Sequence, residues 1–374
     1  MKPPALRSRR TLLQHALAAP LLAPLGALAP LPAVRAATVA FSPVVEGTPL
    51  AFPRDFGAHP GFRTEWWYMT GWLARPDGRP CGFQLTFFRS RTGHDEANPS
   101  RFAPTQLLFG HAALALPERA HLVHAQCAAR AGLGLAWARE GNTDVAIDDW
   151  SLQRQDGRYL AAVTAPELSM HLEVQPDKPP ILQGRDGFSQ KGPRPEQASY
   201  YYSETQLRVA GRIAVPELDR GTPLSVTGTA WLDHEWSSTL LDPAAAGWDW
   251  IGINLHDGSS LMAFRIRTRA GDTLWSHAAW TAASGAPLAR GESRWQPLRR
   301  WRSPRSGATY PVALQVTIGG ATLDLQPLMD DQEVDARAST GTVYWEGAVR
   351  VAHQGREIGR GYLELTGYAA ALKL

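Results

Sequence analysis

The pattern of apolar and polar positions predicts short β-strands through most of the chain. Four segments alternate apolar and polar residues or are rich in β-forming residues, and turn residues bound each one: 82–88, 168–174, 225–231 and 323–327. Alternation with a period of two is typical of strands, whereas an amphipathic helix repeats about every 3.6 residues. We find no long capped helical pattern after residue 36. The sequence therefore predicts an all-β protein.

Two patterns recur in the same order, which indicates an internal duplication. Residues 66–91 and 248–267 each start with paired aromatic residues, pass an Asp-Gly turn and end at two arginines. Residues 202–228 and 344–367 share a Tyr-x-Glu triplet, spaced apolar residues and a Thr-Gly pair. Asp-Gly favours tight hairpins because glycine accepts a positive φ. Chance similarity between common aromatic hairpins is the alternative to a duplicated meander of strands, which would close or nearly close into barrels able to hold one ligand.

The first 36 residues have the features of an export leader. Arg9-Arg10 precedes a run rich in alanine and leucine, and small residues precede Ala36 and Ala37, near which we expect cleavage. This arrangement is typical of a twin-arginine signal peptide. A membrane anchor is the alternative, but prolines interrupt the run below the roughly 20 residues that a span needs. We therefore expect a periplasmic or secreted protein that is not transmembrane after leader removal.

The charge balance gives no indication of a nucleic-acid partner. The chain has 38 basic and 35 acidic residues, and five basic but no acidic residues lie in positions 1–36. Removal of the leader leaves 33 basic and 35 acidic residues. Because the mature chain is slightly acidic, we expect it not to bind nucleic acid.

Several familiar catalytic and metal-binding motifs are missing. The sequence has no Gly-x-Ser-x-Gly and no His-Glu-x-x-His, so it does not support a serine hydrolase or a metallohydrolase. His121 and His124 have a spacing that suits a metal, but without nearby carboxylates or cysteines we interpret them as a surface pair. The sequence leaves open whether Cys81 and Cys127 form a disulfide bond. We expect no metal and no cofactor.

The segment Trp231–Trp236 is the main candidate for chemistry, because it places Asp233, His234 and Glu235 between two tryptophans. Burial in apolar surroundings disfavours a charged carboxylate and raises its pKa, which suits a proton donor. On a strand, Trp231, Asp233 and Glu235 share one face, and His234 and Trp236 share the other. The alternative is structural: the two acids bind arginines or backbone amides at a domain junction, as buried charges usually do.

Two further clusters combine acids with aromatic residues. Glu65 and Trp67 would share one face of a strand, and Trp66 and Tyr68 the other. Glu65 is a potential partner of Arg63 or of a more distant arginine. The candidate ligand-binding set takes in these clusters and the tryptophans: Glu65, Trp66, Trp67, Tyr68, Trp231, Trp236, Trp248, Trp250, Trp345 and Glu346. Packing in a core explains these residues as well as an apolar ligand does.

Five motifs in order along the chain resemble the AttH/CrtC family: 59–71, 231–236, 247–250, 344–347 and 361–368. The family is similar to a pair of lipocalin-like barrels, so the resemblance implies two lipocalin-like (calycin-type) antiparallel β-barrels or half-barrels packed side by side. We place the two domains at 37–235 and 236–374. Members include carotenoid 1,2-hydratases, exported proteins called secreted hydrolases, and related folds that act on polyketides and terpenoids.

The resemblance leaves two functions open. The leader and the Glu-Trp-Trp-Tyr signature resemble the AttH branch, often described alongside transporter permeases. This implies a lipocalin-like protein that binds an apolar or amphipathic molecule, such as a lipid or isoprenoid, and possible work with an ABC transporter. The alternative is a cofactor-free lyase, hydratase or isomerase of an isoprenoid-type substrate. Hydratases of the family are thought to use an aspartate in a comparable motif, which makes Asp233 the candidate acid.

The position of Asp233 and Glu235 distinguishes the two functions. An aromatic cavity reached by either acid would favour the enzyme, because protonation of an alkene needs a buried acid and a site that stabilises a carbocation. Tryptophan faces would contribute about 0.5–2 kcal/mol each to that cation. Filled barrels with both acids paired to arginine would argue against catalysis.

Overall fold

The computed structural model describes residues 40–94, 98–100, 102–216, 218, 221–239 and 241–372. The leader predicted for residues 1–36 lies outside this part, so its role stays a prediction. The regular secondary structure of the described residues is β-strand apart from short 3-10 turns, among them η1 (Arg54–Phe56) and η2 (Pro117–Arg119). No helix in the described part of the chain is long and apolar enough to cross a membrane.

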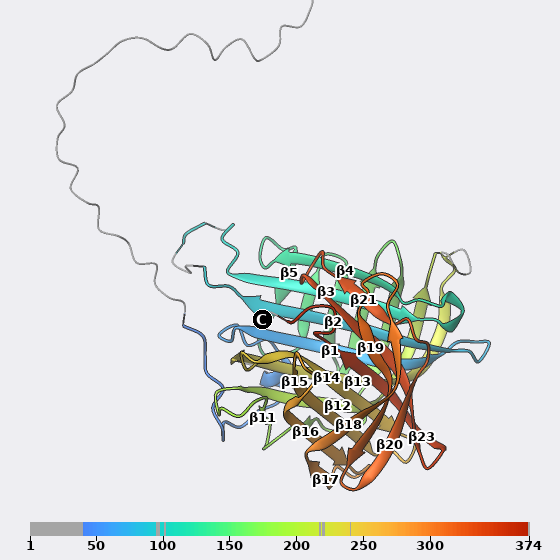
Figure 1. Ribbon diagram of the computed structural model, residues 1–374. Coiled ribbons are helices and arrows are strands. Elements are labelled where there is room, and N and C mark those ends of the chain that lie inside the picture. The colour runs from blue at the N-terminus through green and yellow to red at the C-terminus, as the bar shows by residue number, and fades with distance from the viewer. Residues whose placement is uncertain are drawn as a thin grey trace, which may run out of the picture. The chain divides into compact units, whose positions relative to one another are not determined.

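The first half of the described chain forms one antiparallel sheet, here called sheet A (Figure 1). The main strands follow the order β4-β3-β2-β1-β13-β12-β9-β8-β7-β6-β5, and β10 and β11 pair with β12. Their bounds are β1 (Thr64–Ala74), β2 (Pro80–Arg91), β3 (Gln106–Ala115), β4 (Val123–Arg130), β5 (Ala136–Ala138), β6 (Asp144–Ile147), β7 (Trp150–Gln155), β8 (Arg158–Thr164), β9 (Ser169–Gln175), β10 (Ile181–Leu182), β11 (Phe188–Gln190), β12 (Ala198–Ala214) and β13 (Leu224–Thr239). Because β6 also contacts β3 and β4, the sheet curls back on itself.

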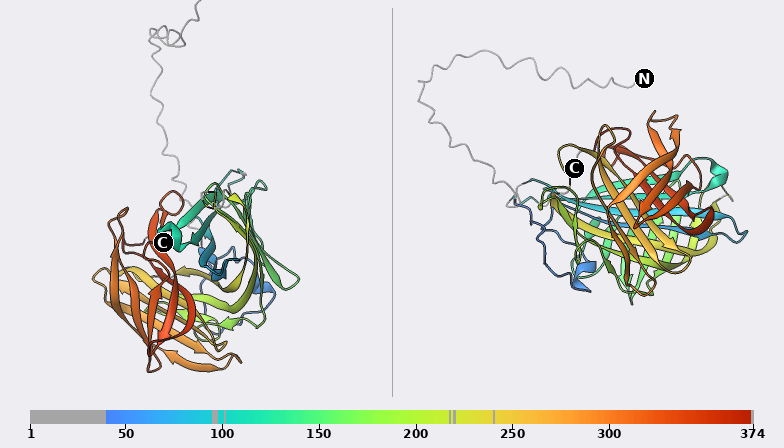
Figure 2. Two further views of the ribbon diagram at one scale, coloured as in Figure 1. Left: turned by 90° about the vertical axis from the view of Figure 1, so that its right-hand side faces the viewer. Right: turned by 60° about the horizontal axis from the view of Figure 1, so that its bottom comes forward.

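The second half forms sheet B, in the order β17-β16-β15-β14-β23-β22-β20-β19-β18, with β21 paired to β22. Its bounds are β14 (Ala245–Leu255), β15 (Ser260–Thr268), β16 (Thr273–Thr281), β17 (Pro287–Gly291), β18 (Ser293–Arg302), β19 (Thr309–Ile318), β20 (Ala321–Pro327), β21 (Glu333–Ala336), β22 (Thr342–His353) and β23 (Arg356–Leu365). β16 and β17 approach β18 and β19, so this sheet also curls (Figure 2).

The two sheets repeat one topology, as the duplicated sequence pattern predicts. In each sheet the opening hairpin, β1-β2 or β14-β15, lies beside the last hairpin of its half, β12-β13 or β22-β23. The hairpin turns lie at Asp77-Gly78 and Asp257-Gly258, where the two glycines have φ of 78° and 82°. Only glycine adopts such angles without strain, so the Asp-Gly pairs set the register.

Each curled sheet is filled by its own apolar core. The core of sheet A includes Trp67, Phe83, Phe87 and Tyr159, and the core of sheet B includes Trp345. A third cluster lies between the sheets and joins Tyr68 and Trp231 of sheet A to Trp250 and Phe264 of sheet B. The expected ligand space inside a barrel is therefore occupied by side chains, because aliphatic and aromatic residues pack together there.

The change from sheet A to sheet B falls between Thr239 of β13 and Ala245 of β14. This lies a few residues after the boundary placed at 235/236. Residues 38–374 cluster as one unit by their contacts, so the division into two domains at that boundary stays a prediction.

The two cysteines are free thiols in the structure, on β2 and β4 with β3 between them. Burial raises the pKa of both Cys81 and Cys127 to about 12. Since the thiolate is the reactive form, neither thiol is activated for chemistry.

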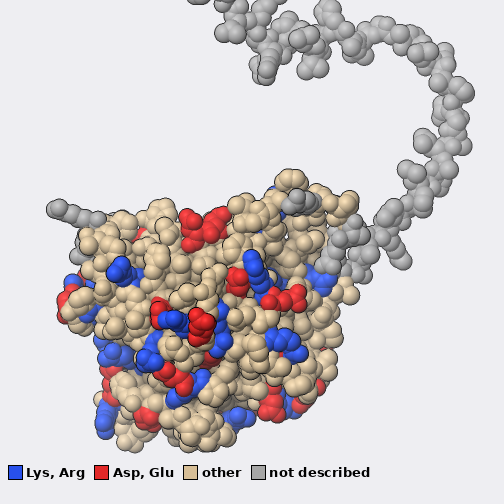
Figure 3. Space-filling model, turned by 180° about the vertical axis from the view of Figure 1, so that it is seen from behind, with Lys and Arg blue, Asp and Glu red and all other residues tan. Residues whose placement is uncertain are grey.

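Basic and acidic side chains are interspersed on the face shown in Figure 3. Several pairs on the described surface are bidentate or close ion pairs, such as Arg208 with Asp177 and Arg305 with Asp331. This face therefore has no extended field of one sign.

Candidate functional site

Strand β13 divides the Trp231–Trp236 segment between two environments. Asp233 and Glu235 line a cavity between the two sheets. His234 and Trp236 lie on the opposite face, where His234 stacks on Trp67. The alternation expected from the sequence is therefore present, and the face that carries both acids is the one that meets sheet B.

Strand β1 is divided in the same way, because it pairs with β13 residue by residue. Trp66 lies opposite Glu235 and Tyr68 opposite Asp233, and both aromatic rings line the cavity. Trp67 lies opposite His234 on the other face. Side chains opposite each other across an antiparallel pair point to one face, so the two sequence clusters form a single wall.

The cavity between the sheets, here called the inner chamber, has a volume of about 110 Å³. Aromatic side chains from both sheets line this small space. The complete lining is Thr64, Trp66, Tyr68, Gln84, Phe88, Lys191, Asp233, Glu235, Leu241, Trp248, Trp250, Phe264, Ile266, Tyr344 and Glu364.

A wider cavity of about 580 Å³, here called the vestibule, adjoins the inner chamber. Both cavities share Thr64, Phe88, Leu241, Trp248, Tyr344 and Glu364. The vestibule adds hydroxyl groups from both halves of the chain, among them Ser238 and Ser339. A chamber rich in aromatic side chains beside a wider cavity that adds hydroxyl groups suits an amphipathic molecule.

Three donors hold the carboxyl group of Asp233, which is only 3% exposed. The hydroxyl of Ser203 and the indole Nε1 of Trp231 both donate to Oδ1, each at 2.6 Å. The phenol of Tyr201 donates to Oδ2 at 2.6 Å. Because Oδ1 already accepts two hydrogen bonds, Oδ2 is the oxygen better suited to carry a proton.

Burial raises the pKa of Asp233 to about 7, although the three hydrogen bonds act in the opposite direction. The neighbouring charge of Glu235 raises it further. A carboxylic acid with such a pKa is partly protonated at neutral pH and can act as a general acid.

Glu235 forms an ion pair with Lys191, whose Nζ lies 3.0 Å from Oε1. Lys191 follows β11, and its ammonium group lies over the rings of Tyr201 and Phe264, at 4.7 and 4.2 Å from their centroids. Burial lowers the pKa of Lys191, while the charges of Glu235 and Asp233 raise it. Among the described residues neither acid of β13 pairs with an arginine, and Lys191 is the basic partner of Glu235.

Sheet B contributes two further acids near the chamber. Glu364 lines both cavities and accepts a hydrogen bond from the indole of Trp248 at 2.8 Å. Burial raises the pKa of Glu364 to about 7, with help from the charges of Asp233 and Glu235. Glu346 accepts a hydrogen bond from Tyr68, and burial raises its pKa well above the usual value.

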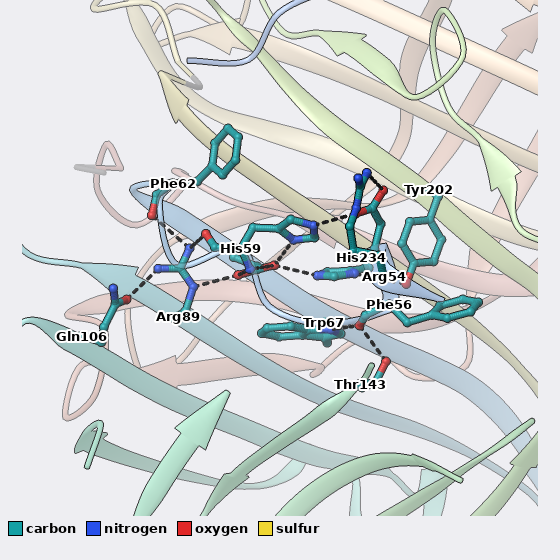
Figure 4. A network of polar contacts seen from close by, with 12 residues as sticks. Arg54, Phe56, His59, Phe62, Trp67, Arg89, Gln106, Thr143, Tyr202 and His234 are labelled. Carbon is teal, nitrogen blue, oxygen red and sulfur yellow. Dashed lines mark hydrogen bonds and ion pairs between the residues drawn. The ribbon is translucent and has the colours of Figure 1, made fainter. Parts of the chain in front are cut away.

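A separate polar network fills one end of the interior of sheet A (Figure 4). Glu65 accepts hydrogen bonds from Nδ1 of His59 at 2.7 Å and from Nε2 of His234 at 2.9 Å, and Nε of Arg89 lies 2.7 Å from its other oxygen. Burial opposes ionisation of Glu65, but these bonds and charges hold its pKa below the usual range. The arginine partner expected for Glu65 is therefore Arg89, a more distant residue than Arg63.

His59, Glu65 and His234 also form a set of potential metal ligands, since one donor atom of each lies within 4.8 Å of the others. The surrounding bonds argue against a resident cation. Arg89 already neutralises Glu65, and bonds to Asp55 and Glu65 raise the pKa of His59 despite its burial. An imidazolium between two carboxylates satisfies this site without a metal.

The remaining predicted site residues lie away from the inner chamber. Trp345 packs in the core of sheet B and donates its indole hydrogen to the carbonyl oxygen of Asp330. Trp236 stacks on His59 at 3.7 Å between ring centroids. Their side chains point to interior faces, because a strand shows only alternate residues to any one surface.

Sequence reasoning did not place Lys191, Tyr201 or Glu364 in the candidate set. Tyr201 sits in the run Tyr200-Tyr201-Tyr202, and Glu364 in the motif 361–368 that supports the family resemblance, so both had a local signal. Lys191 lies in an irregular segment without one. Its role depends on β11 lying beside β12 in sheet A.

Comparisons with known proteins agree with this architecture. A protein from Nitrosomonas europaea assigned to AttH has a crystal structure that matches with 51% identity and a TM-score of 0.81, over 88% of this chain and all of that one. Kievitone hydratase from Nectria haematococca matches with 13% identity and a TM-score of 0.67, over 88% of this chain and 98% of that one, which supports the fold alone. No functionally curated protein matches the chain in sequence. The profile of the AttH-like family matches residues 43–368, and the chain therefore belongs to the AttH-like family.

Proposed function

We propose that the protein is a cofactor-free hydratase-type lyase that adds water to an isolated carbon–carbon double bond of an isoprenoid-type substrate. The placement of Asp233 carries this proposal: its carboxyl group lies in a chamber of aromatic rings, and burial keeps it partly protonated at neutral pH. Protonation of an alkene needs such a buried acid beside a surface that stabilises a carbocation. The filled barrels do not oppose it, because the cavity lies between them.

In the first step Asp233 acts as the acid. The O–H bond at Oδ2 breaks, the π electrons of the alkene form a new C–H bond, and a carbocation remains on the neighbouring carbon. The rings of Trp66, Trp248 and Trp250 line the chamber, and their quadrupoles stabilise this positive charge. The carboxylate left on Asp233 stabilises the same cation through space.

In the second step Glu364 acts as the base. It lies where the chamber meets the vestibule, so water that enters from the vestibule reaches Glu364. A lone pair of the water forms the C–O bond, and one water proton passes to the Glu364 carboxylate. The charge of Asp233 contributes to the raised pKa of Glu364, so one of the two acids retains a proton, and exchange with solvent returns it from Glu364 to Asp233 before the next cycle.

The fold relationship to kievitone hydratase is consistent with this chemistry but does not carry it, because the two sequences share only 13% identity. The argument from this chain rests on Asp233, Glu364 and the rings around them. A hydratase of this kind needs acid, base and a cation-stabilising surface, and the inner chamber contains all three.

The test begins with the natural ligand. The mature protein is purified from its own host, co-purifying lipid is identified by mass spectrometry, and that lipid is incubated with the wild type and with Asp233→Asn in heavy-oxygen water. We expect the wild type to form a labelled alcohol and the variant to form none. Binding of the lipid without turnover by either protein would overturn the hydratase.

A second candidate function is binding and presentation of an amphipathic molecule. The vestibule favours it, since 580 Å³ exceeds what a water and one alkene group need, and its hydroxyl groups suit a polar head. In that role the protein would be exported by the twin-arginine route to the periplasm and would deliver its ligand to an ABC transporter. Growth of a deletion strain on the co-purifying lipid, compared with a strain that carries Asp233→Asn, separates the roles, because a carrier tolerates the substitution and an enzyme does not.

A further inference from the structure

The inner chamber already binds one ammonium group, that of Lys191. Its Nζ combines an ion pair to Glu235 with contacts to the faces of Tyr201 and Phe264. This combination of a carboxylate and aromatic faces is the one by which proteins recognise organic cations. The contacts of Lys191 therefore show that the chamber lining can bind an ammonium group.

The rest of the lining offers the same chemistry without a second basic group. The carboxyl groups of Asp233 and Glu364 share the lining with the rings of Trp66 and Trp248, and Lys191 is the one basic side chain in the described lining. The lining thus has three carboxyl groups for one ammonium. Glu346 adds a fourth acid directly behind Tyr68.

Gln84 is an independent indication of a ligand that donates a hydrogen bond. It lines the chamber, it is 1% exposed, and its Oε1 has no hydrogen-bond partner among the described residues. Its Nε2 is already used, since it donates to Thr86 and Tyr344. A buried acceptor without a donor is costly, and a ligand with an N–H group would satisfy it.

We propose that the inner chamber binds lipophilic ammonium ions, with the protonated amine among Asp233, Glu364 and Gln84 and the attached apolar chain against the aromatic walls. The inference rests on the proposed function in one respect: the ammonium occupies the place of the carbocation. It extends that function by naming a class of ligand that the site selects by charge.

Charge explains why the chamber selects a cation over an anion of the same size. An anionic head would face three carboxyl groups and would have only Lys191 as a partner, which Glu235 already holds. A neutral head gains the apolar contacts but not the attraction to the rings and acids. The expected order of affinity is therefore ammonium, then alcohol, then carboxylate.

The experiment compares three probes with one chain length: N,N-dimethyloctylammonium, 1-octanol and octanoate. Isothermal titration calorimetry with the full mature protein at neutral pH measures each dissociation constant below the concentration at which the probes aggregate. We expect the ammonium to bind roughly tenfold more tightly than octanol, and octanoate to bind more weakly than octanol. Equal affinity for the three probes, or a preference for octanoate, would overturn the proposal.

A variant locates the binding in the chamber. Glu364→Gln keeps an acceptor for the indole of Trp248 and removes one charge, so we expect it to weaken ammonium binding by roughly tenfold and to leave octanol binding unchanged. Glu173→Gln is the matched control, because Glu173 is an exposed acid of β9 that pairs with Arg158. An equal effect of both substitutions would place the cation on the outer surface and contradict the proposal.

These outcomes differ from those that test the hydratase. Selective ammonium binding with no turnover of any alkene would contradict the hydratase function and support the cation site. If the protein hydrated the natural lipid and the ammonium probe did not inhibit this reaction, the cation site would be contradicted and the hydratase function supported.

Discussion

Tyr201 donates its phenolic hydrogen to Oδ2 of Asp233 at 2.6 Å, and the same phenol oxygen accepts a hydrogen bond from the indole of Trp250 at 3.1 Å. Asp233 belongs to sheet A and Trp250 to sheet B. The orientation of the candidate acid is therefore coupled to the packing between the sheets.

Replacement of Tyr201 by phenylalanine removes this link. A hydrogen bond to the carboxylate lowers the pKa of Asp233, so its loss raises that pKa. We expect the pH at which hydration declines to move upward, together with a loss of stability of about 1–3 kcal/mol from the unpaired Trp250 indole. Tyr202→Phe is the control, since Tyr202 bonds His234 on the opposite face; an equal shift of the pH profile in this variant would contradict the assignment.

The activity should decrease as pH rises through about 7. Asp233 donates a proton only in its acid form, and burial raises its pKa to about 7, so the fraction of active acid falls above this pH. Because the base Glu364 also has a pKa raised to about 7 and works only when ionised, the rate should decline on the acidic side as well. The rate of water addition to the co-purifying lipid, measured from pH 5 to 9, tests this expectation. A rate that rises steadily through the same range would exclude Asp233 as the acid.

Glu364→Gln should change which product forms and should have less effect on the first proton transfer. With Asp233 intact, the carbocation still forms. Because no base accepts the water proton, addition of water slows, and the carbocation more often loses a proton to give an isomerised alkene. In deuterated water we expect deuterium in the recovered alkene and a lower yield of alcohol, measured by mass spectrometry. An unchanged alcohol yield would remove Glu364 from the mechanism.

Asp233→Asn should stabilise the folded protein at alkaline pH. A raised folded-state pKa means that ionisation of Asp233 costs stability, and this cost grows as pH rises from the unfolded pKa near 4 through about 7. We expect the variant to be more stable than the wild type by several kcal/mol at pH 8 and equal to it near pH 4, as measured by urea unfolding. If the difference in stability between the variant and the wild type did not change with pH, ionisation of Asp233 would not cost the folded protein stability.

Glu65→Gln should destabilise the fold, because it leaves Arg89 and His59 without their shared carboxylate. The folded pKa of Glu65 is lowered, so its contribution is present above the unfolded pKa and is lost as pH falls through the folded value. The folded pKa of His59 is raised, so its contribution is full below the unfolded value of 6.5 and declines as pH rises through the folded value.

We therefore expect Glu65→Gln to cost about 3–5 kcal/mol near pH 6, measured by urea unfolding. Glu173→Gln breaks an exposed pair with Arg158 and should leave the stability nearly unchanged. Similar costs for the two substitutions would mean that the network of Glu65 adds no more than a surface ion pair.

The local sequence pattern determined the strand faces, the hairpin turns and the duplicated topology of this protein. Alternation along 65–68 and 231–236 established which residues share a face, and the Asp-Gly pairs placed the turns of both opening hairpins. The ordered repeats predicted the duplicated topology of the sheets. These features follow from the period of two and from turn chemistry, which act over a few residues and can be read without the fold.

Only the tertiary structure decided where the chemistry lies. Alternation does not predict which face of a strand packs inside its own barrel and which packs against the other sheet. The fold decides this, and it places Asp233 in the chamber and Trp345 in the core of sheet B. Lys191 and Glu364 reach the chamber from segments far apart in sequence. Their burial and their mutual charges, which set the protonation of the site, arise only when the two sheets pack together.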